Sequence, residues 1–155
     1  MRKTLIASTA GLVLLAALPS AAQDLVDGSA VHAVLGIARD YGSAIIETHI
    51  DGNPKISGRI DGIPYAVRFA SCVEGSGCAH LNFHAGFTGV SPTLERINEW
   101  NAGKRFGRAF LDAAVEPRIE MDVNIGGGVT AGNLGATFAL WRLVLNQYAA
   151  FIGFR

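Results

Sequence analysis

Two segments that flank the only two cysteines of the chain alternate between apolar and polar residues. These segments are PYAVRFASC, residues 64–72, and CAHLNFHAGF, residues 78–87. Alternation with a period of two is typical of a β-strand with one buried face, because successive side chains of a strand point to opposite sides. We therefore predict an antiparallel hairpin whose inward side chains are Tyr65, Val67, Phe69, Leu81, Phe83, Ala85 and Phe87.

The rest of the chain predicts helices and further strands around this hairpin. Helices are predicted from Asp27 as N-cap to Gly42, from Ser91 as N-cap to Gly103, and after the glycine run at 126–128. Further strands are predicted at residues 44–50, 54–60, 105–112 and 118–125. The order of elements is helix, three or four strands, helix, two strands, helix. This order predicts an α+β fold in which helices pack on one face of an antiparallel sheet.

The N-terminus has the features of a secretory signal peptide. Arg2 and Lys3 precede an uncharged stretch rich in Leu and Ala, and small residues that end at Ala22 offer a cleavage site. A membrane anchor needs about 20 apolar residues, and this stretch is shorter. We expect residues 1–22 to be removed and residues 23–155 to form a single domain in the periplasm, without a membrane span.

The charge of the chain argues against nucleic acid as a partner. It has 13 basic and 13 acidic residues, a formal net charge of 0, and no run of basic residues. Proteins that bind nucleic acid neutralise phosphates with clustered Lys and Arg side chains. We therefore predict no nucleic acid partner.

Cys72 and Cys78 connect the expected export with the expected hairpin. In an oxidising compartment, two cysteines usually pair. If residues 73–77 form the hairpin loop, the cysteines lie opposite each other, where Cα atoms are about 4.5 to 5.5 Å apart, as a disulfide requires. A redox centre is disfavoured, because catalytic dithiols typically have the spacing C-x-x-C at the start of a helix. We predict a structural disulfide.

A metal site is the alternative for this region, because two histidines follow Cys78 on the same strand. The cysteine pair sets a register in which Ala70 faces His80, Arg68 faces Asn82 and Ala66 faces His84. The two histidines then share a face but lie about 13 Å apart along the strand, with the positive charge of Arg68 between them. That distance is too long for one metal ion, and bonded cysteines are not available as ligands. We predict solvent-facing histidines and no metal site.

The motifs that signal an enzyme are missing or incomplete. IGGGVTA, residues 125–131, has the form of a dinucleotide fingerprint, but it lacks the βαβ unit and the acidic residue about twenty positions later. There is no G-x-S-x-G motif. Glu120 and Asp122 alternate with apolar residues along one strand, as solvated carboxylates do. We therefore predict no enzyme, no catalytic residue and no cofactor.

One block has more aromatic and polar residues than its local structure requires. INEWNAGKRFGRAFLD, residues 97–112, places these residues at a helix-to-strand junction. In one interpretation the tryptophan fills the core and the polar side chains bond backbone groups at the helix end. In the other, the block is a binding cluster. The candidate residues are Asn98, Trp100, Asn101, Arg105, Phe106, Arg108 and Asp112.

The chain resembles the YbjN domain family, a group of bacterial proteins regarded as sensory transduction regulators. The resemblance rests on the segments DGNPKISGRIDGIPYAVRF, SCVEGSGCAHLNF, NEWNAGKRFGRAFLD and EMDVNIGGGV. It implies a fold similar to type III secretion chaperones, which form a protein-binding and often dimeric unit, and it implies no established catalytic residue or cofactor. AAVEP, residues 113–117, departs from the family pattern, which has an acidic, glycine-containing turn at this point.

The last helix has an apolar stripe that admits two interpretations. Its members are Phe138, Trp141, Leu145, Tyr148 and Ile152. The stripe packs into the core, or it is an interface for a protein partner or a second copy of the chain. We expect a non-catalytic, protein-binding module of a regulatory or chaperone-like kind, whose partner the sequence does not identify and which can act as a homodimer. The alternative is a periplasmic protein that binds a small molecule or a metal.

Overall fold

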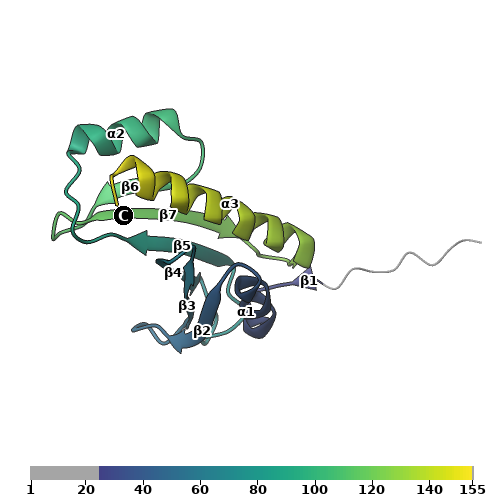
Figure 1. Cartoon of the computed structure of the whole chain (residues 1–155). Coiled ribbons are helices and arrows are strands. Elements are labelled where there is room, and N and C mark those ends of the chain that lie inside the picture. Colours follow the sequence, from purple (N-terminus) through teal and green to yellow (C-terminus); the bar gives the residue numbers. More distant parts are fainter. Residues whose placement is uncertain (1–24, 155) are drawn as a thin grey trace, which may run out of the picture.

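The computed structural model describes residues 25–154, which form a six-stranded antiparallel sheet, a two-stranded sheet and three helices (Figure 1). The helices are α1 (Val31–Arg39), α2 (Leu94–Gly103) and α3 (Ala131–Phe151). The strands of the large sheet are β2 (Ser43–Thr48), β3 (Pro54–Ile60), β4 (Ile63–Ala70), β5 (His80–Gly86), β7 (Pro117–Asn124) and β6 (Arg108–Leu111), given in spatial order. β1 (Leu25–Val26) pairs with β8 (Val129–Thr130). The predicted signal peptide, residues 1–22, lies outside the described residues.

The helices pack on one face of the large sheet, which confirms the predicted α+β fold class. α3 runs along β5 and β7, whereas α1 lies against β2 and β3 (Figure 1). The predicted inward side chains of the hairpin are all buried. Within residues 25–154, no helix combines the length and hydropathy that a membrane span requires. The likeness to type III secretion chaperones stays a prediction.

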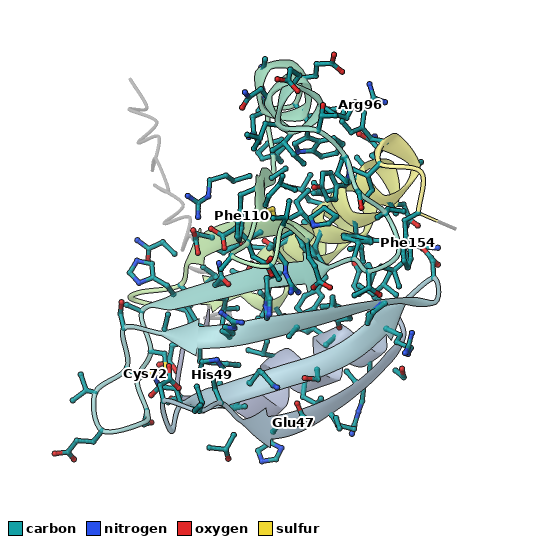
Figure 2. The ribbon with its side chains drawn as sticks, turned by 90° about the vertical axis from the view of Figure 1, so that its left-hand side faces the viewer. Glu47, His49, Cys72, Arg96, Phe110 and Phe154 are labelled. Carbon is teal, nitrogen blue, oxygen red and sulfur yellow. A yellow bond between two sulfur atoms is a disulfide. The ribbon has the colours of Figure 1, made fainter. Side chains whose placement is uncertain are left out.

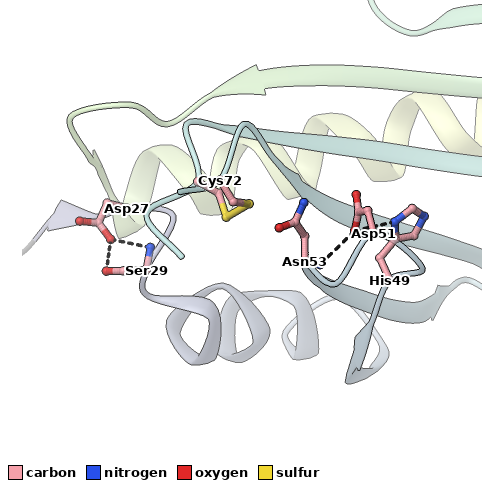
Figure 3. Close-up of a disulfide and its surroundings, with 7 residues drawn as sticks. Asp27, Ser29, His49, Asp51, Asn53 and Cys72 are labelled. Atoms are coloured by element: carbon pink, nitrogen blue, oxygen red, sulfur yellow. Dashed lines mark hydrogen bonds and ion pairs between the residues drawn. A yellow bond between two sulfur atoms is a disulfide. The ribbon is translucent and has the colours of Figure 1, made fainter. Parts of the chain in front are cut away.

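The hairpin around the cysteines has the predicted register. Ala66 pairs with His84, Arg68 with Asn82, and Ala70 with His80. Cys72 and Cys78 form a disulfide in the loop that joins β4 to β5 (Figure 3). Gly28 packs against this loop so closely that a Cβ would come within 1.8 Å of the carbonyl oxygen of Cys78. The hairpin tip and the segment before α1 therefore fit together only with glycine at this position.

The predicted N-caps of two helices are wrong. α1 begins four residues after Asp27, whose Oδ1 accepts hydrogen bonds from the backbone N–H and the hydroxyl of Ser29 (Figure 3). Thr93, and not Ser91, caps α2, and its Oγ1 accepts a hydrogen bond from the backbone N–H of Arg96 at 3.2 Å. Short polar side chains also close turns outside helices, so such a residue near a helix start does not mark its first turn uniquely.

The apolar stripe of α3 belongs to the core. Phe138, Trp141, Leu145 and Tyr148 are fully buried, and Ile152 is half-buried. The ring of Phe138 lies edge-on against that of Phe83 on β5, with centroids 4.9 Å apart. The structure thus decides between the two interpretations of this helix: the stripe packs on the sheet and does not form an exposed interface.

Candidate functional site

The junction between α2 and β6 is built around Trp100. This side chain is 1% exposed, and its ring lies edge-on against Tyr148 and Phe151 of α3, with centroids 5.0 and 5.5 Å away. Its Nε1 donates a hydrogen bond of 2.9 Å to the carbonyl of Gly107. Trp100 therefore attaches α2 to the C-terminal half of α3, and it attaches the loop before β6 to α2.

Asn101 takes the place of a neighbouring strand for β6. Its Oδ1 accepts a hydrogen bond from the N–H of Ala109, and its Nδ2 donates one to the carbonyl of Ala109, each at 2.9 Å. Ala109 is buried, so its backbone groups need partners within the protein. Trp100 and Asn101 thus have the structural role that was one of the two interpretations of this block.

Other side chains of the same block face solvent. Phe106 is 47% exposed. Arg105 is also exposed and forms no salt bridge within residues 25–154. Arg108 forms an ion pair with Glu120 of β7, and Asn98 is exposed on α2. The structure therefore divides the predicted cluster into a structural pair and an exposed group that can contact another molecule.

A cleft lies where β6 stops short of the end of β7. Pairing of the two strands ends at Arg108 opposite Glu120, whereas β7 continues to Asn124. Gly107, with a φ of +79°, sets the direction of the chain just before β6, in a conformation that favours glycine. The cleft has a volume of about 620 Å³. It is lined by Asn101, Lys104, Arg105, Phe106, Gly107, Arg108, Glu120, Met121 and Asp122.

The sequence patterns predicted only part of this cleft. Lys104 and Gly107 lie inside the block but were not among its candidates, although KRFGR, residues 104–108, places three cations around an aromatic residue and a glycine. Met121 and Asp122 come from β7. The sequence predicted Asp122 only as a solvated carboxylate, and Met121 is buried; both border the cleft because pairing of β6 with β7 stops at Arg108 opposite Glu120.

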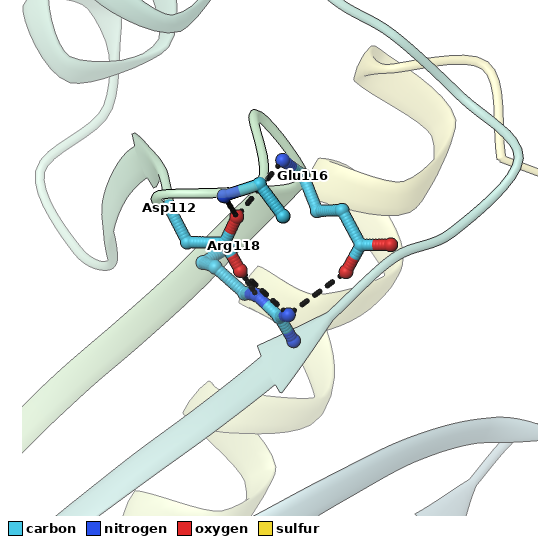
Figure 4. Close-up of polar contacts among 4 residues, drawn as sticks. Asp112, Glu116 and Arg118 are labelled. Atoms are coloured by element: carbon cyan, nitrogen blue, oxygen red, sulfur yellow. Dashed lines mark hydrogen bonds and ion pairs between the residues drawn. The ribbon is translucent and has the colours of Figure 1, made fainter.

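Asp112 organises the turn between β6 and β7 (Figure 4). Its Oδ1 accepts hydrogen bonds from the N–H groups of Ala114 and Glu116 at 2.9 and 3.0 Å, and its Oδ2 accepts one from Nε of Arg118 at 2.8 Å. The bond from the Glu116 backbone, followed by that from Arg118, lowers the pKa of the Asp112 carboxyl. Val115 in the same turn has a φ of +62°, which β-branched residues rarely adopt.

The face of the sheet opposite the helices is uncovered and polar. Glu47 of β2 and Phe110 of β6 mark its two ends (Figure 2). His80 and His84 lie on this face and are half-buried. Burial and the nearby charge of Arg68 lower the pKa of His84 to about 4, so its imidazole is neutral at pH 7. Within residues 25–154, no group of three or more His, Cys, Asp and Glu side chains is arranged to hold a metal ion.

The opposite edge of the sheet is a second exposed surface. Within residues 25–154, β2 pairs only with β3, and it exposes Ile45 by 56% and Ile46 by 36%. Ile50, in the turn that follows β2, is also exposed. An edge strand with exposed apolar side chains is a template for pairing with another chain.

These features define an α+β domain with one open sheet face and a cleft at one sheet edge. The chain belongs to the YbjN family, whose model matches residues 31–154 and is described as "Putative bacterial sensory transduction regulator". The match confirms the resemblance that the sequence segments indicated, and it spans all elements from α1 to α3. The family is described as a regulator and not as an enzyme. A search of curated proteins found no match to this chain.

Proposed function

We propose that this chain is an exported, non-catalytic regulatory module that binds an extended segment of a partner protein in the cleft beside β6. The proposal rests on the unpaired edge of β7 at Met121–Asn124. On the side away from β5, no strand within residues 25–154 pairs with this segment. An extended peptide can add to such an edge through backbone hydrogen bonds, while neighbouring pockets select its side chains. Binding of this kind fits a family described as regulators.

The lining of the cleft favours an acidic segment that also carries an apolar side chain. Lys104, Arg105 and Arg108 are positively charged, and within residues 25–154 only Arg108 has an acidic partner, Glu120. A carboxylate of the partner can therefore pair with Arg105 without displacing an existing ion pair. The exposed ring of Phe106 offers a surface for an apolar side chain.

A photoreactive residue in the cleft tests this proposal. Benzoylphenylalanine at position 106 replaces Phe106 with a larger aromatic side chain, and a second variant carries it in place of His32, which is exposed on α1. After irradiation of cells, we expect covalent protein adducts from position 106 and none from position 32. Absence of adducts at position 106, or equal yields from both positions, contradicts the proposal.

Charge reversal within the cleft sharpens the same test. Arg105→Glu, added to the variant with the photoreactive residue, should reduce the adduct yield because it repels an acidic segment. Arg59→Glu is the matched control, since Arg59 is an exposed arginine of β3. An equal reduction by both changes points to a general effect of charge and counts against an acidic partner in the cleft.

The β2 edge supports a second contact, between two copies of the chain. In an antiparallel pair of β2 strands, Ile45 of one copy can lie opposite Ile45 of the other on the open face of a continuous sheet. Ile45→Lys then places like charges opposite each other and should give a monomer in light scattering, whereas Ile50→Lys in the turn should not. A wild-type protein that is monomeric at high concentration contradicts this contact.

Export is proposed from the sequence of residues 1–22, and the disulfide of Cys72 and Cys78 supports it because such bonds persist in oxidising compartments. The intact mass of protein from the periplasmic fraction tests it. We expect the mass of residues 23–155 less two hydrogens. A mass that includes residues 1–22 contradicts export, and an extra retained mass favours the small-molecule alternative.

A further inference from the structure

The centre of the open face holds a positive charge that no acidic side chain within residues 25–154 neutralises. Arg68 of β4 lies directly opposite Lys55 of β3, and like charges in this arrangement destabilise a sheet. Lys55 has an acidic partner, since its Nζ lies 2.7 Å from Oε2 of Glu47. Arg68 is exposed and forms no salt bridge in the part of the chain that the structure describes. Stability of the sheet therefore does not explain this charge.

His84 is the diagonal neighbour of Arg68 across β4 and β5. Its Nδ1 is buried and lacks a hydrogen-bond partner within residues 25–154. Burial, the largest cause, and then the charges of Arg68, Arg118 and Lys55 lower the pKa of His84 to about 4. The imidazole is therefore uncharged at neutral pH and lies in a positive local field, which favours an anion nearby.

Arg118 of β7 reaches the same region in a fixed position. Its Nε and Nη2 donate hydrogen bonds to Asp112 and Glu116 (Figure 4). The guanidinium lies across Gly86, where a Cβ would come within 1.8 Å of Nη1. Nη1 itself forms no hydrogen bond with the residues that the structure describes. Gly86 therefore makes room for a guanidinium that keeps donor capacity for a ligand.

A hollow of about 330 Å³ lies between these groups, and this volume is at the lower end of small-ligand pockets. Its lining includes Arg68, His84, Phe110 and Arg118. Asp112 and Glu120 also line it, but each is already bound to an arginine. The acidic groups of the lining are thus neutralised, whereas the charge of Arg68 is not.

We propose that this hollow binds a small molecule through an oxyanion, a carboxylate or a phosphate, held between Arg68 and Nη1 of Arg118. Guanidinium groups form charge-assisted hydrogen bonds with both kinds of oxyanion. The half-buried ring of Phe110 offers a surface for an apolar part of the molecule. The site lies on the open face and does not depend on protein binding in the cleft.

NMR titration of the full mature chain with inorganic phosphate and with benzoate tests this site. Phosphate is a free oxyanion, whereas benzoate carries its carboxylate on a ring that can contact Phe110. We expect saturable shifts centred on Arg68, His84 and Arg118. Tighter binding of benzoate identifies an organic acid as the ligand class, and tighter binding of phosphate identifies a phosphate group. The proposal is overturned if neither probe saturates.

Two arginine variants separate the site from general charge effects. Arg68→Gln should weaken the tighter probe about tenfold or more, since a hydrogen bond to a charged group is lost. Arg59→Gln, at an exposed arginine of β3 that does not line the hollow, should leave binding of the probe unchanged. Binding should also raise the pKa of His84, because a nearby anion favours the imidazolium. Equal weakening by both variants, or an unchanged affinity of Arg68→Gln, overturns the proposal.

Discussion

The two faces of the large sheet have opposite chemistry although the same strands form both. The helix-covered face is a continuous core in which Phe83 and Phe138 are fully buried. The open face carries the half-buried imidazole of His84 and the charge of Arg68, which has no ion-pair partner within residues 25–154. Phe83 and His84 are neighbours in the chain, and the alternation of a strand sends them to opposite sides. The difference indicates that one face supplies the stability of the fold and the other is available for recognition.

Phe138→Glu should have the largest effect, because it places a charge in the packed core of the covered face. We expect the free energy of unfolding to fall by about 4 kcal/mol or more, so that the variant is unfolded by circular dichroism. Ala139→Glu is the matched control on the exposed side of α3 and should change stability by less than about 0.5 kcal/mol. A folded Phe138→Glu protein would restore the interface interpretation of this helix.

Asn101→Ala should have the next largest effect, although Asn101 itself is exposed. It removes both hydrogen bonds to the buried backbone of Ala109, and we expect a loss of about 2 kcal/mol in urea unfolding. Asn98→Ala on the same helix is the control and should be close to neutral. If both variants unfold at the same urea concentration, Asn101 does not serve as the neighbour of β6.

His84 should make the open face a source of acid sensitivity. Its pKa is about 4 in the folded chain and 6.5 in its ordinary state, so between these values the unfolded chain binds more protons. Stability is therefore fully present above pH 6.5 and falls as the pH is lowered towards 4. With allowance for partial exposure, we expect a loss of about 1 to 2 kcal/mol that His84→Gln abolishes and His32→Gln does not. Parallel pH profiles of wild type and His84→Gln in phosphate-free buffer contradict this role.

Val115→Gly should have a small and stabilising effect. Val115 has a φ of +62°, a conformation that costs a β-branched residue free energy and that glycine adopts freely. We expect a gain of about 1 kcal/mol in the free energy of unfolding. Ala113→Gly in the same turn is the control and should be neutral or destabilising, because it only adds freedom to the unfolded chain. A loss of stability in Val115→Gly shows that this turn is not strained.

The hairpin could be predicted from the sequence because two independent constraints coincide there. Alternation assigns the inward side chains, and the bond between Cys72 and Cys78 fixes which residues face each other. A strand slip by one residue would exchange both faces, so the register is strongly specified. The largely apolar pattern of α3, whose one charged residue is Arg142, was less informative, because a helix that is apolar on several sides does not reveal which side is covered.

The cleft could not be predicted from local patterns. Its shape depends on the start of β6 at Arg108, on the conformation of Gly107 and on the hydrogen bond from Trp100 that holds the loop before β6. The charge at Arg68 was visible in the sequence and in the predicted register. It was interpreted only as an obstacle to a metal site. The hollow beside it could not be predicted because its lining also includes Arg118 and Phe110, which are far from Arg68 in the sequence.

Amide hydrogen exchange along β7, measured by NMR on the free protein, tests most directly whether the cleft has an open strand edge. Arg118–Glu120 is paired on both sides, so its amides should all exchange slowly. In the part of the chain that the structure describes, Met121–Asn124 is paired only with β5, so every second amide should point to the cleft and exchange fast. Slow exchange at all amides of Met121–Asn124 would mean that this edge is already covered, and would contradict its role as the binding edge for a partner.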